Sequence, residues 1–516
     1  MKLTDSFSLF LYAFKLKRCE LEKQDSIWKR SQLEPEKNFF FDHVQDFFTK
    51  NNNQDEKVLD ESCCLRYELN RDKLSAIQKE KLLLINQLFS RTSHTETNNS
   101  DSSISFKVVT DNSIIGPGIL LNPITGIGIL SFGFSLTKDT GTLEQLIKLN
   151  YKSRVFGRQD SALFLIPRNQ HPAAQEQEEL IDKKLLSFHS NLVAKADGQY
   201  HYWNIETLTN ILLQDIPSDN ITIISPNRLQ GFTFVQTERL LDEYELNLAS
   251  FRLRRMYNYN YTSGMKFTQN TEETDQTFEQ IHFGASIEGC VVIVNGDKES
   301  LPPFLTKYSI VIKNRYIWSY FLAYYQRLAL IEMSVDLARL YEHGKPKLEK
   351  LLHVTSDLSK IELRTLFSQV SYFSQHNDFY NFCKNNLKLD EMYAEIKEKL
   401  SSISRIVQEE VEIEEKDKEK KREKKDRLLE VMIAALLIPE IIFEFLSMLE
   451  HVFEINFPLE EHRTFTYILF AFSSLLFLTL LPFAFRIYKE YYHIAKAYFK
   501  KEELSDDVGF KKFYIE

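Results

Sequence analysis

The chain has 516 residues, of which 73 are Asp or Glu and 64 are Lys or Arg, so its formal net charge at pH 7 is −9. This acidic balance argues against a protein whose whole surface binds nucleic acid, and the length allows about three structural units of ~150 residues each. The five cysteines are an odd number without a CxxC spacing, which is typical of reduced thiols in a cytoplasm.

The N-terminal third of the chain carries three different patterns. Apolar residues alternate between Phe7 and Phe14, and no small-residue cleavage site follows, so the pattern predicts a strand and not a signal peptide. Residues 25–90 are predicted to be mostly helical, because the apolar residues between Phe39 and Phe48 are spaced for one helical face. Residues 91–103 are polar and low in complexity, which predicts a flexible insertion.

From Ile104 to about Lys313 the pattern is mixed α/β. A hairpin is predicted from Ile114–Leu121 and Ile127–Leu136, and Thr142 is a suitable N-cap for a helix that begins at Leu143. Further strands are predicted at 104–110, 162–166, 221–225, 232–235, 281–286 and 290–294. Residues 1–313 are therefore interpreted as a cytosolic α/β sensor domain, a sheet with helices on at least one side.

Residues 314–427 are predicted to form a helical stalk region. Helical spacing runs over Asn314–Tyr341 and over Leu348–Asn385. A final helix is expected to begin at Leu389, and no Gly or Pro interrupts it before Pro439. A helix from Leu389 to Ile438 would be roughly 75 Å long at 1.5 Å per residue.

Two apolar segments, 428–449 and 465–485, have about the ~20 residues that cross a bilayer as a helix. Lys and Arg are abundant before the first and after the second, whereas the connecting turn is acidic. This bias predicts a membrane hairpin at 428–487 in the cell inner membrane, a multi-pass protein with both termini cytoplasmic and a cytoplasmic tail at 488–516. The expected fold is thus an α/β cytosolic domain followed by a long helical stalk and two C-terminal transmembrane helices.

Polar residues form a stripe on the first of these segments. They recur at intervals of four, three, four and three and so share one helical face: Glu440, Glu444, Ser447, His451 and Glu454. In a homo-oligomer with this helix at its axis, the stripe would line a pore, because acidic rings attract cations. The alternatives are hydrogen bonds between helices or a position at the membrane surface.

The predicted architecture resembles the CorA family of divalent-cation channels. In that family the first membrane helix ends in a Gly-Met-Asn loop, and here the corresponding turn reads Glu454-Ile455-Asn456-Phe457-Pro458. Asn456 and Phe457 match this degenerate loop motif, whereas Glu454 and Ile455 replace its Gly and Met. The departure is similar to that of the CorA-like membrane effectors associated with type III CRISPR systems.

This resemblance implies a homo-oligomeric channel in the lipid bilayer, an antiviral effector opened by a nucleotide second messenger of the SAM-AMP type. Two alternatives remain: a magnesium-like divalent-cation transporter, and a membrane-anchored sensor or scaffold that conducts nothing. The candidate ligand-binding segment combines guanidinium groups, which clamp phosphate, with aromatic rings, which stack on a base: Arg252, Arg254, Arg255, Tyr257 and Tyr259. The end of a surface helix followed by a Tyr-rich strand would give the same pattern.

The sequence contains no motif that indicates an enzyme. GxSxG, GxxxxGK[ST], HExxH and a Cys/His metal spacing are all absent from the sequence. Gly116 and Gly118, like Gly126 and Gly128, are interpreted as hairpin glycines rather than phosphate loops. We therefore expect no enzymatic activity, no cofactor and no nucleic-acid partner.

Overall fold

The structure is a computed structural model of the whole chain, and some ranges of it are described. The described residues are 1–17, 21, 26–31, 33–36, 38–48, 64–70, 93–95, 104–109, 113–136, 141–154, 163–167, 200–213, 216–217, 219–225, 228–261, 272–296, 299, 301–342, 348–456, 471, 482, 486 and 489. The chain divides into two compact units, Met1–Glu410 and Val411–Glu516, and each is described by itself.

The first unit is built around β1 (Leu3–Leu16), which confirms the predicted N-terminal strand. It pairs antiparallel with β7 (Ile127–Leu136) on one side and with β11 (Gln230–Thr237) on the other. Almost every residue of β1 is buried, including the polar Ser6 and Ser8. A central strand covered on both faces reads as a nearly continuous apolar run, and this explains the composition of the segment.

The described strands form a single sheet of fourteen strands in the order β12-β13-β14-β11-β1-β7-β5-β4-β8-β9. A branch runs from β7 through β6 and β3 to β2, and β10 pairs with the end of β1. Neighbouring strands are antiparallel except β11 and β14, the parallel pair among the described strands. The remaining bounds are β2 (Trp28–Arg30), β3 (Leu65–Leu69), β4 (Ser93–Thr95), β5 (Ile104–Val108), β6 (Gly118–Leu121), β8 (Leu163–Pro167), β9 (Tyr200–Asn204), β10 (Ile221–Ile223), β12 (Thr274–Phe278), β13 (Ile281–Ala285) and β14 (Gly289–Val294).

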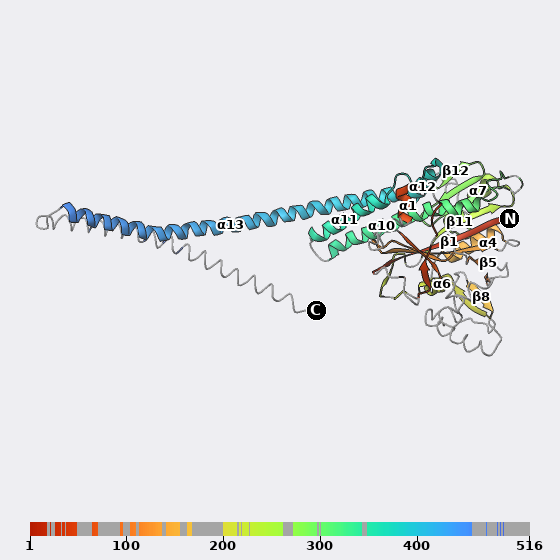
Figure 1. Ribbon diagram of the computed structural model, residues 1–516, viewed down its shortest axis with the longest axis horizontal. Coiled ribbons are helices and arrows are strands. Elements are labelled where there is room, and N and C mark those ends of the chain that lie inside the picture. The colour runs from red at the N-terminus through yellow and green to blue at the C-terminus, as the bar shows by residue number, and fades with distance from the viewer. Residues whose placement is uncertain are drawn as a thin grey trace. The chain divides into compact units, whose positions relative to one another are not determined.

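Helices pack on both faces of the centre of the sheet (Figure 1). On one face, Phe10 and Tyr12 of β1 join the core that contains Leu146 of α4 and Leu253 of α7. On the other face the ring of Phe7 stacks on Phe232 of β11, which in turn contacts the ring of Tyr320 in α10. The described helices are α1 (Asp42–Phe48), α4 (Leu143–Ser153), α6 (Ile205–Leu213), α7 (Glu243–Arg254), α9 (Tyr308–Val311), the π-helical turn η2 (Ile312–Tyr316), α10 (Ile317–Glu342), α11 (Leu348–Thr365), α12 (Ser374–Asn386) and α13 (Leu389–Asn456).

Local signals predicted several of these elements correctly. The hairpin β6–β7 is confirmed, and so are the strands expected near 104, 162, 221, 232, 281 and 290. Thr142 caps α4: its side chain accepts a hydrogen bond from the backbone N–H of Gln145, while the Gln145 side chain accepts one from the backbone N–H of Thr142. This reciprocal capping box fixes where α4 begins.

Two expectations on helices were wrong. The described residues of 25–90 contain the short helix α1, but they also contain β2 and β3, and β3 pairs with β6; the other residues of this range lie outside the described ones. Residues 348–385 form two helices, because the segment between α11 and α12 turns back on itself. The Asn377 side chain accepts the backbone N–H groups of Val370 and Ser371 at 2.8 and 3.0 Å and holds that turn.

The expectation of two C-terminal transmembrane helices is corrected by the structure. Residues 428–449 lie inside α13, and among the described residues no helix is both long and apolar enough to cross a membrane. Glu440 and Glu444 interrupt the apolar run there, and a carboxylate at a bilayer centre is costly. Residues 465–485 lie outside the described residues except for positions 471 and 482. The described fold is therefore a mixed sheet with helices. The prediction of a multi-pass protein of the inner membrane was wrong.

A buried histidine lies where α12 packs against η2. The ring centroid of His376 lies 4.1 Å from that of Phe39 and 4.8 Å from that of Tyr316. Neither ring nitrogen has a hydrogen-bond partner among the described residues. Burial, with a smaller contribution from Arg315, lowers the pKa of His376 from 6.5 to about 3. The imidazole is therefore held neutral inside an aromatic cluster.

This histidine should make the stability of the fold depend on pH. In the unfolded chain His376 takes up a proton near pH 6.5, whereas in the folded chain it resists protonation down to about pH 3. The free energy of unfolding should therefore fall as pH drops from 6.5, by at most about 1.4 kcal/mol per pH unit for this one group. We expect His376→Leu to reduce the slope in urea denaturation series between pH 6.5 and 4.5; His282, whose pKa burial lowers to about 4, contributes the same kind of slope and remains. The exposed His353→Leu serves as the control, and an unchanged slope in His376→Leu would contradict the prediction.

Candidate functional site

Three cavities in the first unit bring polar side chains together. The arginine pocket, about 480 Å³ in volume, has as its polar walls Arg154, Arg228, Arg327, Tyr257, Tyr324 and Glu288. The α10–α11 pocket, about 280 Å³, is lined by Lys15, Thr125, Glu332, Asp336, His353, Asp357 and Lys360 among others. The junction cavity, about 480 Å³, lies at the start of α13 and is lined by Arg255, Glu272, Glu273, Glu288, Asn386, Lys388 and Asp390 among others.

Five separate parts of the chain build the arginine pocket, one of them the turn that contains Ile287 and Glu288. Arg154 is the C-cap of α4, and its carbonyl accepts the backbone N–H of Leu229 at 3.0 Å. That bond joins the end of α4 to the residue that follows Arg228. Arg327 comes from α10, and Tyr257 follows the end of α7. The pairing of β1 with β11 brings these segments to one place.

The side chain of Met256, packed against Gly231, forms part of one wall of the pocket. Met256, buried and with a φ of 50°, places its methyl group against Gly231 of β11. A Cβ at position 231 would lie 1.8 Å from Met256 Cε, so no other residue fits there without displacing Met256. The next side chain along, Gln230, donates from Nε2 to the hydroxyl of Tyr320 at 2.8 Å. Two contacts therefore position this wall: the packing of Met256 on Gly231 and the hydrogen bond from Gln230 to Tyr320.

The charge in the arginine pocket is unbalanced. Three guanidinium groups face one carboxylate, Glu288. Among the described residues, neither Arg228 nor Arg327 forms an ion pair with a carboxylate, since each lies farther than 4.0 Å from one. Arg154 and Arg327 are partly buried, and burial lowers the pKa of Arg327, whereas Arg228 is exposed. Guanidinium groups that converge on one cavity favour an anion there.

Aromatic rings hold the first of these guanidinium groups in place. The Cζ atom of Arg154 lies 4.8 Å from the ring centroid of Tyr151 and 5.4 Å from that of Tyr257. Both distances are within the range of cation–π contacts. Tyr324 closes another part of the wall and is almost fully buried, and burial raises the pKa of its hydroxyl. The pocket thus combines oriented cations with aromatic surface.

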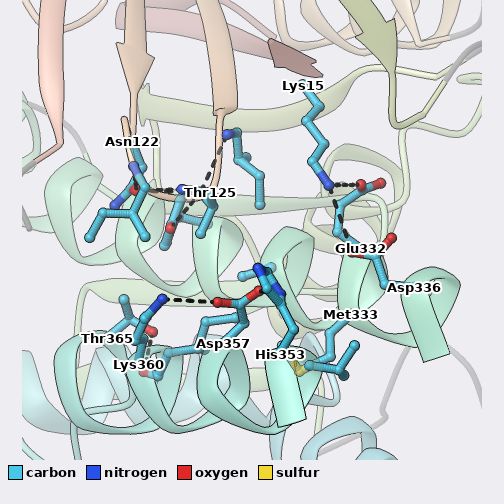
Figure 2. A pocket seen from close by; sticks show the side chains of 16 residues that line it. Lys15, Asn122, Thr125, Glu332, Met333, Asp336, His353, Asp357, Lys360 and Thr365 are labelled. Carbon is cyan, nitrogen blue, oxygen red and sulfur yellow. Dashed lines mark hydrogen bonds and ion pairs between the residues drawn. The ribbon is translucent and has the colours of Figure 1, made fainter. Parts of the chain in front are cut away.

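The α10–α11 pocket has charges that neutralise one another (Figure 2). Lys15 Nζ lies 2.9 Å from the carboxylate of Glu332 and 3.8 Å from that of Asp336. The carboxylate of Asp357 lies 3.0 Å from His353 Nδ1 and 3.1 Å from Lys360 Nζ. Its cations are engaged by its own carboxylates, so this pocket has no clear preference for a charged ligand.

The segment that the sequence suggested for ligand binding is largely engaged in internal contacts. Arg254 is fully buried, and both Arg254 and Arg255 donate to the carboxylate of Glu273. Arg252 donates to the carbonyl of Tyr261 and lies over the ring of Tyr259. Of the five residues only Tyr257 lines the arginine pocket, while Arg255 lines the junction cavity. Their role in ligand binding stays a prediction.

The residues expected to line a pore belong to α13. The side chains of Glu440, Glu444 and Ser447 are exposed. His451, Glu454 and Asn456 also lie in α13, and Phe457 lies outside the described residues. The ion pathway stays a prediction. Among the described residues no group of three or more His, Cys, Asp or Glu could hold a metal ion.

Sequence reasoning missed Arg154, Arg228 and Arg327. They lie in three separate stretches of sequence, and the aromatic residues of 316–325 that precede Arg327 are also typical of a buried helix, so they did not single it out. The only signal in this region was the run after Arg252, and it pointed to Tyr257. The pocket exists only because distant elements meet.

Breaking the shared ion pair should test whether Arg254 is a structural residue. We expect Glu273→Gln to lower the free energy of unfolding by about 3 kcal/mol, because the buried guanidinium of Arg254 would lose its charged partner. The control is Glu245→Gln, which breaks the exposed pair with Arg239 and should change stability far less. Equal urea midpoints for the two variants would contradict the assignment.

Three comparisons with known proteins leave the family open. No family model matches the chain, and no curated protein or solved structure matches it either.

Proposed function

We propose that the first unit is a binding module for a small phosphate-bearing ligand of the nucleotide class, held in the arginine pocket. One observation carries this proposal. Three guanidinium groups from separate parts of the chain, Arg154, Arg228 and Arg327, line one cavity whose described lining residues include a single carboxylate, Glu288. Arg228 and Arg327 have no carboxylate partner among the described residues, and an anion in the cavity would supply one.

The chemistry of the walls suits both halves of a nucleotide. A guanidinium group can donate two parallel hydrogen bonds to a phosphate, which a lysine cannot do. The partly exposed ring of Tyr257 offers apolar surface for a base, and base–aromatic stacking tolerates any base. The volume of about 480 Å³ is within the usual range for small-molecule sites.

The resemblance noted in the sequence supports the same class of ligand. CorA-like effectors beside type III CRISPR systems imply a nucleotide second messenger of the SAM-AMP type. Our proposal is a binding event and includes no catalytic step and no membrane step.

Titration calorimetry with ATP, AMP and adenosine tests the proposal. Because a hydrogen bond to a charged group contributes about 1.5–3 kcal/mol, Arg228→Gln and Arg327→Gln should each weaken ATP binding by roughly tenfold to a hundredfold. Adenosine, which lacks phosphate, should bind far more weakly than ATP. Added salt should weaken ATP binding further.

The control variant is Lys15→Gln, which changes the charge by the same amount in the α10–α11 pocket and should leave ATP binding unchanged. Thermal melts should show that each variant is folded. Arg228 is exposed, so its substitution should leave the fold intact. The proposal fails if adenosine binds as tightly as ATP, or if the Arg228 and Lys15 variants behave alike.

A further inference from the structure

The arginine pocket is connected to the junction between α12 and α13 by one side chain. Arg327 lines the pocket, and its Nη1 donates to the backbone carbonyl of Leu387 at 2.8 Å. Leu387 is the C-cap of α12, and α13 begins two residues later at Leu389. A cation at the end of a helix satisfies a carbonyl that has no partner within the helix.

The backbone at this junction has an unusual conformation. Lys388 has a φ of 60°, in the left-handed region that residues with a side chain seldom adopt. Short hydrogen-bonded turns hold it there: Leu387 N donates to Cys383 O at 2.9 Å, and Lys388 N donates to Asn385 O at 3.0 Å. A junction held in an unfavoured conformation by a few bonds is sensitive to the loss or gain of one more.

A second segment connects the arginine pocket to the α12–α13 junction. The turn after β13 contributes Ile287 and Glu288 to both the arginine pocket and the junction cavity. Ser286 Oγ lies 2.7 Å from the carbonyl of Arg254 and 3.0 Å from the carboxylate of Glu288, so this turn is held firmly. In the junction cavity, the Asn386 side chain donates to the carbonyl of Glu272 at 3.0 Å. The pocket and the junction thus share a wall.

We propose that an anion in the arginine pocket immobilises the α12–α13 junction, because it fixes the guanidinium of Arg327 between the ligand and Leu387. This inference rests on the proposed function. A guanidinium has five N–H donors, so the bond to Leu387 leaves donors for an anion. An anion on those donors restricts the side chain and thereby strengthens the bond at the end of α12. By reciprocity, a firm junction also increases the affinity for the ligand.

Hydrogen exchange of the full chain, with and without saturating ATP, tests the inference. We expect the amides of Leu387, Lys388 and Met392 to exchange at least about fivefold more slowly when ATP is bound. A factor of about five is the low end of the usual coupling between two sites in a protein. Arg327→Gln, at an ATP concentration that saturates it, should lose this protection. The matched control is Arg228→Gln, which lines the same pocket without contacting the junction and should keep the protection once saturated.

The possible outcomes separate the two proposals. If ATP binds as expected but leaves these amides unprotected in the wild-type chain, the inference is wrong and the proposed function stands. Faster exchange with ATP would overturn it in the same way, as would full protection in saturated Arg327→Gln. If ATP does not bind, both proposals fail. The wild-type measurement decides the matter even if Arg327→Gln does not fold.

Discussion

The first unit depends on β1 being buried on both of its faces. One set of alternate residues, including Phe10 and Tyr12, packs under α4 and α7, and the other set, including Phe7, packs toward α10. A slip of one residue would exchange the two sets, so the register of β1 is strongly determined. Both sides of the arginine pocket are attached to this strand, because α4 and β11 are among its direct neighbours.

A buried polar bridge keeps these neighbours in register. Ser8 Oγ donates to the side-chain oxygen of Asn150 at 2.6 Å, and the Asn150 amide donates to Thr233 Oγ1 at 2.8 Å. The three residues belong to β1, α4 and β11, and each is almost fully buried. Polar atoms in such surroundings cost free energy unless all of them are paired, so the bridge disfavours other alignments of the three elements. The same alignment sets how the end of α4 lies against the start of β11 at the arginine pocket, where Leu229 N donates to the carbonyl of Arg154.

The sequence predicted those parts of the fold that have local causes. The hairpin β6–β7, the cap of α4 and the strand β1 each follow from turn residues, a capping side chain or apolar alternation. The segment Leu65–Leu69 also alternates, but it is short, and its partner β6 lies far along the chain, so its role as a strand was not evident. The arginines of the pocket also could not be predicted from local sequence. A cluster in sequence, Arg254 and Arg255, is neutralised by Glu273, whereas three isolated arginines converge in space.

The place of β1 in the sheet also has a consequence for how the chain folds. Ser8 and Thr233 touch in the core although 225 positions separate them in sequence. A ribosome therefore releases β1 long before β11 exists, and an apolar strand without its partners is prone to bind other chains. Contacts over such separations also slow folding, because a large loop must close before they form. This protein should therefore need protection during its synthesis, and its yield should respond to chaperones and to translation speed more than that of a helical protein of equal size.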